Sequence, residues 1–216
     1  MIALFDLDDT LLDGDSNHLW GRFLVERGVL EAAPFERLQA RYDAEYRAGK
    51  IAFEEYLSFT AGPLRQRSSE ELSAWQRQFA TQHAESALFP QAVALVDSHR
   101  RRGHALVLIT ATNRFFVEPF ARVLGVHALL ASELEQVDGC YTGRPLGEPC
   151  YREGKLRRFR AWLDAEGQAR GETWFYSDSH NDIPLLEHVD NPVAVNPDAA
   201  LRSLAEARRW PILQFR

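Results

Sequence analysis

The stretch Ile2-Ala3-Leu4-Phe5-Asp6-Leu7-Asp8-Asp9-Thr10 begins as an apolar run and ends in carboxylates. The run Ile2–Leu7 is typical of a buried strand in a parallel sheet. Alternate residues of a strand point to the same side, so Asp6 and Asp8 start on one side where the strand ends. Open α/β sheets bind ligands outside the carboxyl ends of their strands. The segment therefore favours a ligand site, although a polar loop in which Asp13 or Asp15 only caps the next helix would use the same residues.

The remainder of the chain alternates apolar runs with helical patterns. Further strands are expected at Ala105–Thr110, Thr173–Tyr176 and Pro192–Val195, with a weaker fifth at His127–Ala131. Helices are expected at Gln91–Arg102, Phe115–Leu124 and Gly154–Glu166, each followed by a glycine that suits a helix C-cap. Residues Gln136–Tyr151 indicate a hairpin or an irregular flap. This alternation predicts an α/β fold with a Rossmann-like parallel sheet.

Residues 14–86 interrupt that alternation. Their apolar residues recur at helical spacing, as in Leu19, Trp20, Phe23 and Leu24, and no strand pattern is present. About four helices are expected there, too many for an ordinary strand-to-helix loop. We therefore expect a core of residues 1–13 plus 87–216 and a helical cap of residues 14–86 over the carboxyl edge of the sheet.

Composition narrows the classes of partner. The 216 residues are 45% hydrophobic and carry a formal net charge of −6, which argues against a nucleic-acid binder. The apolar runs are too short to span a membrane, and the N-terminal residues do not resemble a signal peptide. The two cysteines, Cys140 and Cys150, are expected to be reduced thiols of a cytoplasmic protein. Oligomeric state is left open by the sequence.

Polar residues follow the later strands as well. Thr110 closes the run Val107-Leu108-Ile109, and its hydroxyl and the amides beyond it can donate to a phosphoryl oxygen, although threonine is commonplace there. Lys155 lies at the start of a helix, and only two lysines occur in the chain, which makes a chance surface position less probable. Asp178, Asn181 and Asp182 follow the strand Thr173–Tyr176 and suit either a hard divalent cation or the capping of a helix.

These segments together resemble the four motifs of the haloacid-dehalogenase-like superfamily, which consists mostly of phosphotransfer enzymes. The motifs are Asp6-x-Asp8-x-Thr10, Thr110, Lys155 and Asp178 to Asp182, in that order. A helical insertion directly after the first motif is similar to the C1 cap arrangement of the phosphoserine-phosphatase-like branch.

Three features of the sequence depart from that branch. Thr110-Ala111 stands where Ser-Gly is common, and Ser177 and Ser179 replace two glycines. Asp15 holds a place where the serine phosphatases carry glutamate. Relatives with a similar motif pattern include histidinol-phosphate phosphatases, so the substrate stays open.

The resemblance implies a mechanism. Asp6 would attack phosphorus and form an aspartyl-phosphate, and Asp8 would act as general acid and then general base. Mg²⁺ would be held by Asp6, the backbone carbonyl of Asp8 and Asp178, with Asp182 fixing a metal-bound water. The phosphoryl oxygens would be bound by Thr110, Ala111, Lys155 and Asn181.

The expected substrate is a small phosphorylated metabolite. Asp15 in the cap would face its leaving group and favour an ammonium or imidazolium, unless Asp15 is only a helix cap. His18 would line the same pocket, unless it only packs or caps.

Three other functions share parts of the pattern: a phosphotransferase to an alcohol acceptor, a receiver-type signalling domain, and a non-catalytic interaction module.

Overall fold

The computed structural model describes residues 1–167 and 171–216, and within them the strands form a seven-stranded sheet of order β4-β3-β2-β1-β5-β6-β7. All neighbouring strands pair in parallel except β3 and β4. The expected α/β class with a parallel sheet is confirmed. The strands are β1 (Ile2–Phe5), β2 (Ala105–Asn113), β3 (Ala128–Val137), β4 (Cys140–Leu146), β5 (Thr173–Ser177), β6 (Asn191–Val195) and β7 (Ile212–Leu213).

Helices cover both faces of this sheet, which explains why its central strand β1 is apolar at every position. Ala3 and Phe5 of β1 face the cluster that includes α5 (Pro90–Arg101) and α6 (Arg114–Leu124). Ile2 and Leu4 face the cluster of α7 (Glu153–Ala165), α8 (Ile183–Leu186) and α9 (Ala199–Arg208). β1 lies between β2 and β5, so the carboxyl ends of these three strands meet at the centre of one edge.

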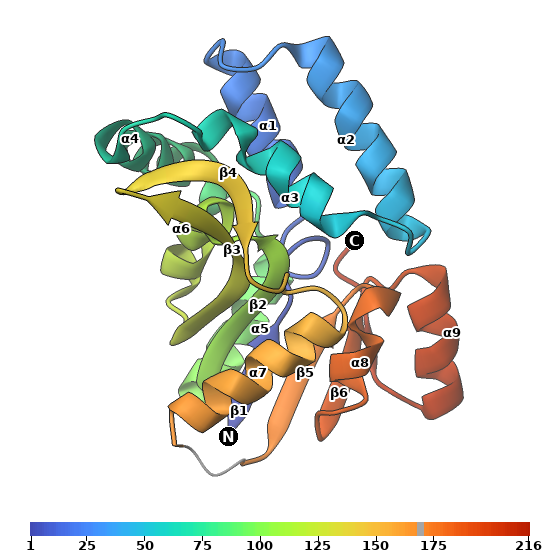
Figure 1. Cartoon of the computed structure of the whole chain (residues 1–216). Coiled ribbons are helices and arrows are strands. Elements are labelled where there is room, and N and C mark those ends of the chain that lie inside the picture. The colour runs from blue at the N-terminus through green and yellow to red at the C-terminus, as the bar shows by residue number, and fades with distance from the viewer. Residues whose placement is uncertain (168–170) are drawn as a thin grey trace.

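Residues 14–86 are helical, as expected. They form α1 (Ser16–Glu26), α2 (Ala32–Arg47), α3 (Phe53–Ala61), η1 (Gly62–Leu64), α4 (Ser69–Phe79) and η2 (Ala80–Ala84). Figure 1 shows α1, α2 and α3 above the edge of the sheet at which the carboxyl ends of the strands meet. The C-terminus of the chain comes up to the same region (Figure 1).

The insertion does not have one hydrophobic core of its own. Trp20 of α1 stacks on Phe79 of α4 at 4.1 Å between ring centroids and on Phe116 of α6 at 5.0 Å. These residues belong to the same buried cluster as β1 and β2. A separate small cluster of Tyr42, Phe53, Tyr56 and Leu57 lies between α2 and α3. The division into core and cap domains therefore stays a prediction.

Several element boundaries differ from the sequence expectation. β1 ends at Phe5 rather than Leu7, because the Leu7 carbonyl accepts from the amides of Thr10, Leu11 and Leu12 in a tight loop. The predicted strand Ala105–Thr110 runs on to Asn113, and its register against β3 shifts between Ile109 and Asn113. Thr110 thus lies inside β2 and does not close it.

The predicted flap is part of a longer hairpin. The weak fifth strand extends to Val137 and pairs with β4 around the turn Asp138-Gly139, where both residues have positive φ. The sequence did not indicate α9 or β7. Cys140 is exposed, Cys150 is buried, and neither forms a disulfide. Within the part of the chain that the structure describes, no helix is both long and apolar enough to cross a bilayer.

Candidate active site

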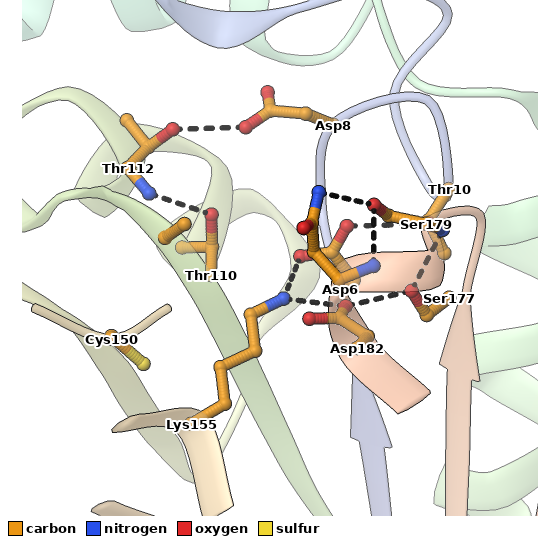
Figure 2. A network of polar contacts seen from close by, with 12 residues as sticks. Asp6, Asp8, Thr10, Thr110, Thr112, Cys150, Lys155, Ser177, Ser179 and Asp182 are labelled. Atoms are coloured by element: carbon orange, nitrogen blue, oxygen red, sulfur yellow. Dashed lines mark hydrogen bonds and ion pairs between the residues drawn. The ribbon is translucent and has the colours of Figure 1, made fainter. Parts of the chain in front are cut away.

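A buried lysine joins two carboxylates at the centre of the site. Lys155 Nζ lies 2.7 Å from Asp6 Oδ1 and 2.7 Å from Asp182 Oδ2. Ser177 Oγ donates to the same Asp182 oxygen at 2.7 Å. Figure 2 shows the Lys155 side chain reaching from α7 to these oxygens beside the loop after β1. Lys155 is only 1% exposed, so its charge is screened little by solvent.

At both Asp6 and Lys155, burial shifts the pKa in one direction and the opposite charge of the partner shifts it in the other. Burial raises the pKa of Asp6 to about 7, against the attraction of Lys155 and with further repulsion from Asp182 and Asp8. Burial disfavours the charged form of Lys155, but Asp182 and Asp6 outweigh it and hold the lysine pKa above its ordinary value. The lysine therefore stays protonated and compensates part of the negative charge at Asp6.

A second pair of carboxylates meets at Thr10. The Thr10 hydroxyl lies 3.0 Å from Asp178 Oδ1 and 3.4 Å from Asp6 Oδ2, and it accepts from the Asp178 amide at 3.0 Å. Burial, followed by the charges of Asp6, Asp9 and Asp182, raises the pKa of Asp178 well above its ordinary value. The two acidic side chains thus come together with no lysine or arginine bonded to Asp178 among the described residues.

This pair fits a hard divalent cation. Among residues 1–167 and 171–216, no group of three or more His, Cys, Asp or Glu side chains is arranged to hold a metal. Mg²⁺ needs no such group, because it is commonly bound through one or two carboxylates and keeps several waters. Asp6 and Asp178 supply two carboxylates, and a cation between them would stabilise the charged forms that burial, and then repulsion from neighbouring carboxylates, disfavour by raising their pKa values.

Asp8 is held on the cap side of the same loop. Its Oδ1 accepts from the Ser16 amide at 2.6 Å. Its Oδ2 accepts from Thr112 Oγ1 at 2.9 Å, as Figure 2 shows. Asn17 Nδ2 donates to the same Thr112 hydroxyl at 3.0 Å. Burial, and then the charge of Asp15, raise the pKa of Asp8 to about 7, although the bonds from Ser16 and Thr112 lower it. A carboxyl with such a pKa can both give and take a proton near neutral pH.

The remaining predicted residues surround a cavity of about 780 Å³. Thr110, Ala111 and Asn181 line it, and the Thr110 hydroxyl accepts from the Thr112 amide at 3.2 Å. Lys155 and Asp182 do not line it, since they lie beneath Asp6. Asn181 Oδ1 accepts from Tyr151 OH at 2.9 Å and from Arg152 Nε at 3.0 Å, which fixes the orientation of its amide.

The helical insertion of residues 14–86 contributes Asp15 and His18 to the cavity wall. Asp15 combines both of the roles considered for it, because it lines the cavity and also accepts from the His18 amide at 3.0 Å as the N-cap of α1. His18 Nε2 forms an ion pair with Asp43 Oδ2 at 2.9 Å.

Sequence reasoning missed three residues of the site. Thr112, which holds Asp8, lies two positions after Thr110, and the two-residue period of a strand could have pointed to it. Asp43 and Arg152 reach the site only through the packing of α2 and of the loop before α7, and no local pattern marks either of them.

Comparisons with known proteins agree with this architecture. The family model described as haloacid dehalogenase-like hydrolase matches residues 3–187. A protein of Neisseria meningitidis serogroup C named histidinol-phosphatase is 38% identical, over 100% of this chain and 99% of that protein. A Mycobacterium tuberculosis protein named phosphoserine phosphatase SerB1 is 36% identical, over 99% of this chain and 70% of that protein.

Solved structures show the same fold. A Bordetella pertussis protein of unknown function is 41% identical and superposes with a TM-score of 0.92, covering 100% of this chain and 98% of that one. A substrate-bound phosphoserine phosphatase is 20% identical with a TM-score of 0.68, covering 98% and 91%, and supports the fold alone. The chain belongs to the haloacid dehalogenase-like hydrolase family, in the branch of its phosphatase relatives.

Proposed function

We propose that this enzyme is a Mg²⁺-dependent phosphatase for a small phosphomonoester of the phosphoserine or histidinol-phosphate type. One observation carries the proposal. Asp6, a buried carboxylate paired with Lys155 at 2.7 Å, lies at the cavity with Asp8 two residues further on. This supplies a nucleophile and a proton donor on one loop, as covalent phosphoryl transfer requires.

In the first step a carboxylate oxygen of Asp6 attacks phosphorus, and the bond from phosphorus to the substrate oxygen breaks. Asp8 gives its proton to that leaving oxygen, so an alcohol departs and an aspartyl-phosphate remains. In the second step Asp8 takes a proton from a water as the water attacks phosphorus. Inorganic phosphate leaves and the Asp6 carboxylate is restored. The pKa of about 7 at Asp8 supports this exchange of roles.

Other residues would position and neutralise the transferred group. Asp6, the Asp8 carbonyl and Asp178 would hold Mg²⁺, which supplies positive charge to the phosphoryl oxygens when bound. Asp182 would orient a metal-bound water. Lys155 would keep Asp6 oriented and offset its repulsion of a phosphate dianion. The Thr110 hydroxyl, the amide of Ala111 and the amide group of Asn181 would bind phosphoryl oxygens.

Phosphate release tests the proposal. The substrates are histidinol phosphate, phosphoserine, a sugar phosphate and 4-nitrophenyl phosphate, each with Mg²⁺ and with EDTA. We expect EDTA to stop release and added Mg²⁺ to restore it.

Asp6→Asn should lose turnover and keep its urea midpoint, whereas Asp13→Asn, which changes an exposed carboxylate of the same loop, should keep both. Turnover by Asp6→Asn, or full activity in EDTA, would overturn the assignment. Alcohol acceptors in the assay distinguish hydrolysis from transfer.

A further inference from the structure

The cap-side end of the cavity holds two carboxylates that the proposed reaction does not use. Asp15 and Asp43 both line the cavity, the first as the N-cap of α1 and the second in the fourth turn of α2. Asp43 Oδ1 accepts from Gln39 Nε2 at 3.1 Å and Asp43 Oδ2 pairs with His18 at 2.9 Å. One hydrogen bond and one ion pair therefore hold the Asp43 carboxylate, which lines the same cavity as Asp6 and Asp8.

Three aromatic rings line the same cavity as these carboxylates. Tyr42, Phe53 and Tyr56 are buried and line the cavity. The Tyr42 and Tyr56 rings lie 5.2 Å apart, and Phe53 meets Tyr56 edge-on at 5.7 Å. Flat rings beside carboxylates are the surroundings that bind organic cations, through the negative faces of the rings and through direct charge pairing.

A buried side-chain acceptor in the cavity also favours a ligand that donates hydrogen bonds. Asn17 is only 4% exposed and lines the cavity, yet its Oδ1 has no hydrogen-bond partner among the described residues. The amide cannot be turned around freely, because Nδ2 donates to a Thr112 hydroxyl that itself donates to Asp8. A buried acceptor without a partner is costly, so this end of the cavity calls for a ligand that donates hydrogen bonds.

Most basic side chains that line the cavity are already paired with a carboxylate. Of the basic residues that line the cavity, His18 pairs with Asp43, His180 with Asp198, and Arg216 with Asp9 and Asp13. Arg47 lines the cavity from the last turn of α2 and is exposed. A carboxylate on the substrate would therefore have to reach Arg47 or face Asp15 and Asp43.

We propose that Asp15, Asp43 and the rings of Tyr42, Phe53 and Tyr56 form a subsite for a protonated nitrogen group on the substrate. This inference rests on the proposed phosphatase function and narrows its substrate class to phosphomonoesters that carry an amine or imidazole and no carboxylate. Among the substrates named above, histidinol phosphate fits this subsite and phosphoserine does not. Asp43 is then a specificity-determining residue that would pair with the protonated nitrogen group at the end of the substrate remote from phosphorus.

Kinetics on three substrates test the subsite. We expect a higher kcat/KM for histidinol phosphate than for phosphoserine. Asp43→Asn should raise KM for histidinol phosphate by about tenfold, since a hydrogen-bonded charge pair is lost, and leave kcat/KM for 4-nitrophenyl phosphate within about twofold. Glu45→Gln removes the same charge from the same helix outside the cavity and should change neither. Equal losses of kcat/KM on all three substrates would overturn the proposal. A higher kcat/KM for phosphoserine than for histidinol phosphate would also overturn it, if Arg47→Gln abolishes that preference.

A binding measurement separates this inference from the proposed function. Histidinol, which has no phosphate, should raise the Tm of the wild-type enzyme and of Glu45→Gln, but not that of Asp43→Asn. If no phosphomonoester is hydrolysed and histidinol still binds through Asp43, the phosphatase assignment fails and the subsite stands. If hydrolysis proceeds and histidinol does not bind, the subsite fails alone.

Discussion

Lys155 is the residue on which the charges of the site depend. It is 1% exposed and pairs at 2.7 Å with both Asp6 and Asp182. Removing one partner of a buried ion cluster leaves an unpaired charge in a poorly solvated place. Lys155→Met should therefore lower the free energy of unfolding by about 3–5 kcal/mol and abolish phosphate release. Urea denaturation at pH 7.5 and a phosphate assay measure the two effects.

The double variant Lys155→Met/Asp182→Asn separates folding from chemistry. Lys155→Met leaves Asp6 and Asp182 without their shared cation, and the second substitution neutralises Asp182. The double variant should therefore regain part of the lost stability, while phosphate release stays absent. Lys50→Met, which changes the other lysine of the chain at an exposed position, serves as the control and should behave as wild type. A Lys155→Met enzyme as stable and active as wild type would show that the lysine is dispensable.

Among the elements, the loop before α7 connects the helical insertion to the site. Arg152 Nη2 donates to the Gly49 carbonyl, between α2 and α3, at 2.9 Å, and its Nε donates to Asn181 at 3.0 Å. Tyr151 stacks on Phe53 of α3 at 4.6 Å. Gly49 has φ +65°, and a Cβ there would lie 2.5 Å from Arg152 Nη2. The loop before α7 and the α2–α3 turn are thus in close contact at Gly49.

Arg152→Ala should lower kcat/KM about tenfold, because Asn181 loses a charged donor and the α2–α3 turn loses its tether. Arg158→Ala provides the comparison, since Arg158 Nη2 donates to the Glu148 carbonyl at 2.8 Å and forms no hydrogen bond with residues 14–86, all of which the structure describes. Steady-state kinetics on histidinol phosphate give the result. Equal activity of the two variants would mean that the contact seen at Gly49 has no part in catalysis.

The same elements show how far sequence reasoning reaches. Asp6, Asp8, Thr110 and Asp178, which line one cavity, could be singled out because each follows or lies in an apolar run that can be recognised along the chain. The end of β2 was misplaced because the register shift after Ile109 depends on the neighbouring strand β3. Asp43 could not be found because the packing of α2, which has no local signature, brings it to the cavity. Arg152 could not be found because it reaches the site only through its bonds to Asn181 and Gly49.

At the scale of the whole molecule, the insertion and the sheet share one buried cluster, and a polar network adjoins it. Phe5 of β1 stacks on Tyr176 of β5 at 5.1 Å, and His99 of α5 meets Phe5 edge-on at 5.7 Å. His99 is 1% exposed, and its ring nitrogens lie 2.8 Å from the Tyr176 hydroxyl and 2.8 Å from His104 Nδ1. Charging this ring would place an unpaired cation against the core that joins the two parts of the chain.

Burial, followed by the charges of His104 and Arg102, lowers the pKa of His99 to about 4, against 6.5 as its ordinary value. The unfolded chain therefore binds a proton at His99 between pH 6.5 and 4 that the folded chain does not, and stability falls as pH falls through that window. From pH 7.5 to 5.0 this residue should remove about 2 kcal/mol from the free energy of unfolding. Urea denaturation of wild type and His99→Gln at both pH values measures it: the variant should be less stable at pH 7.5 and should lose less on acidification. Parallel losses in the two proteins would place the acid sensitivity elsewhere.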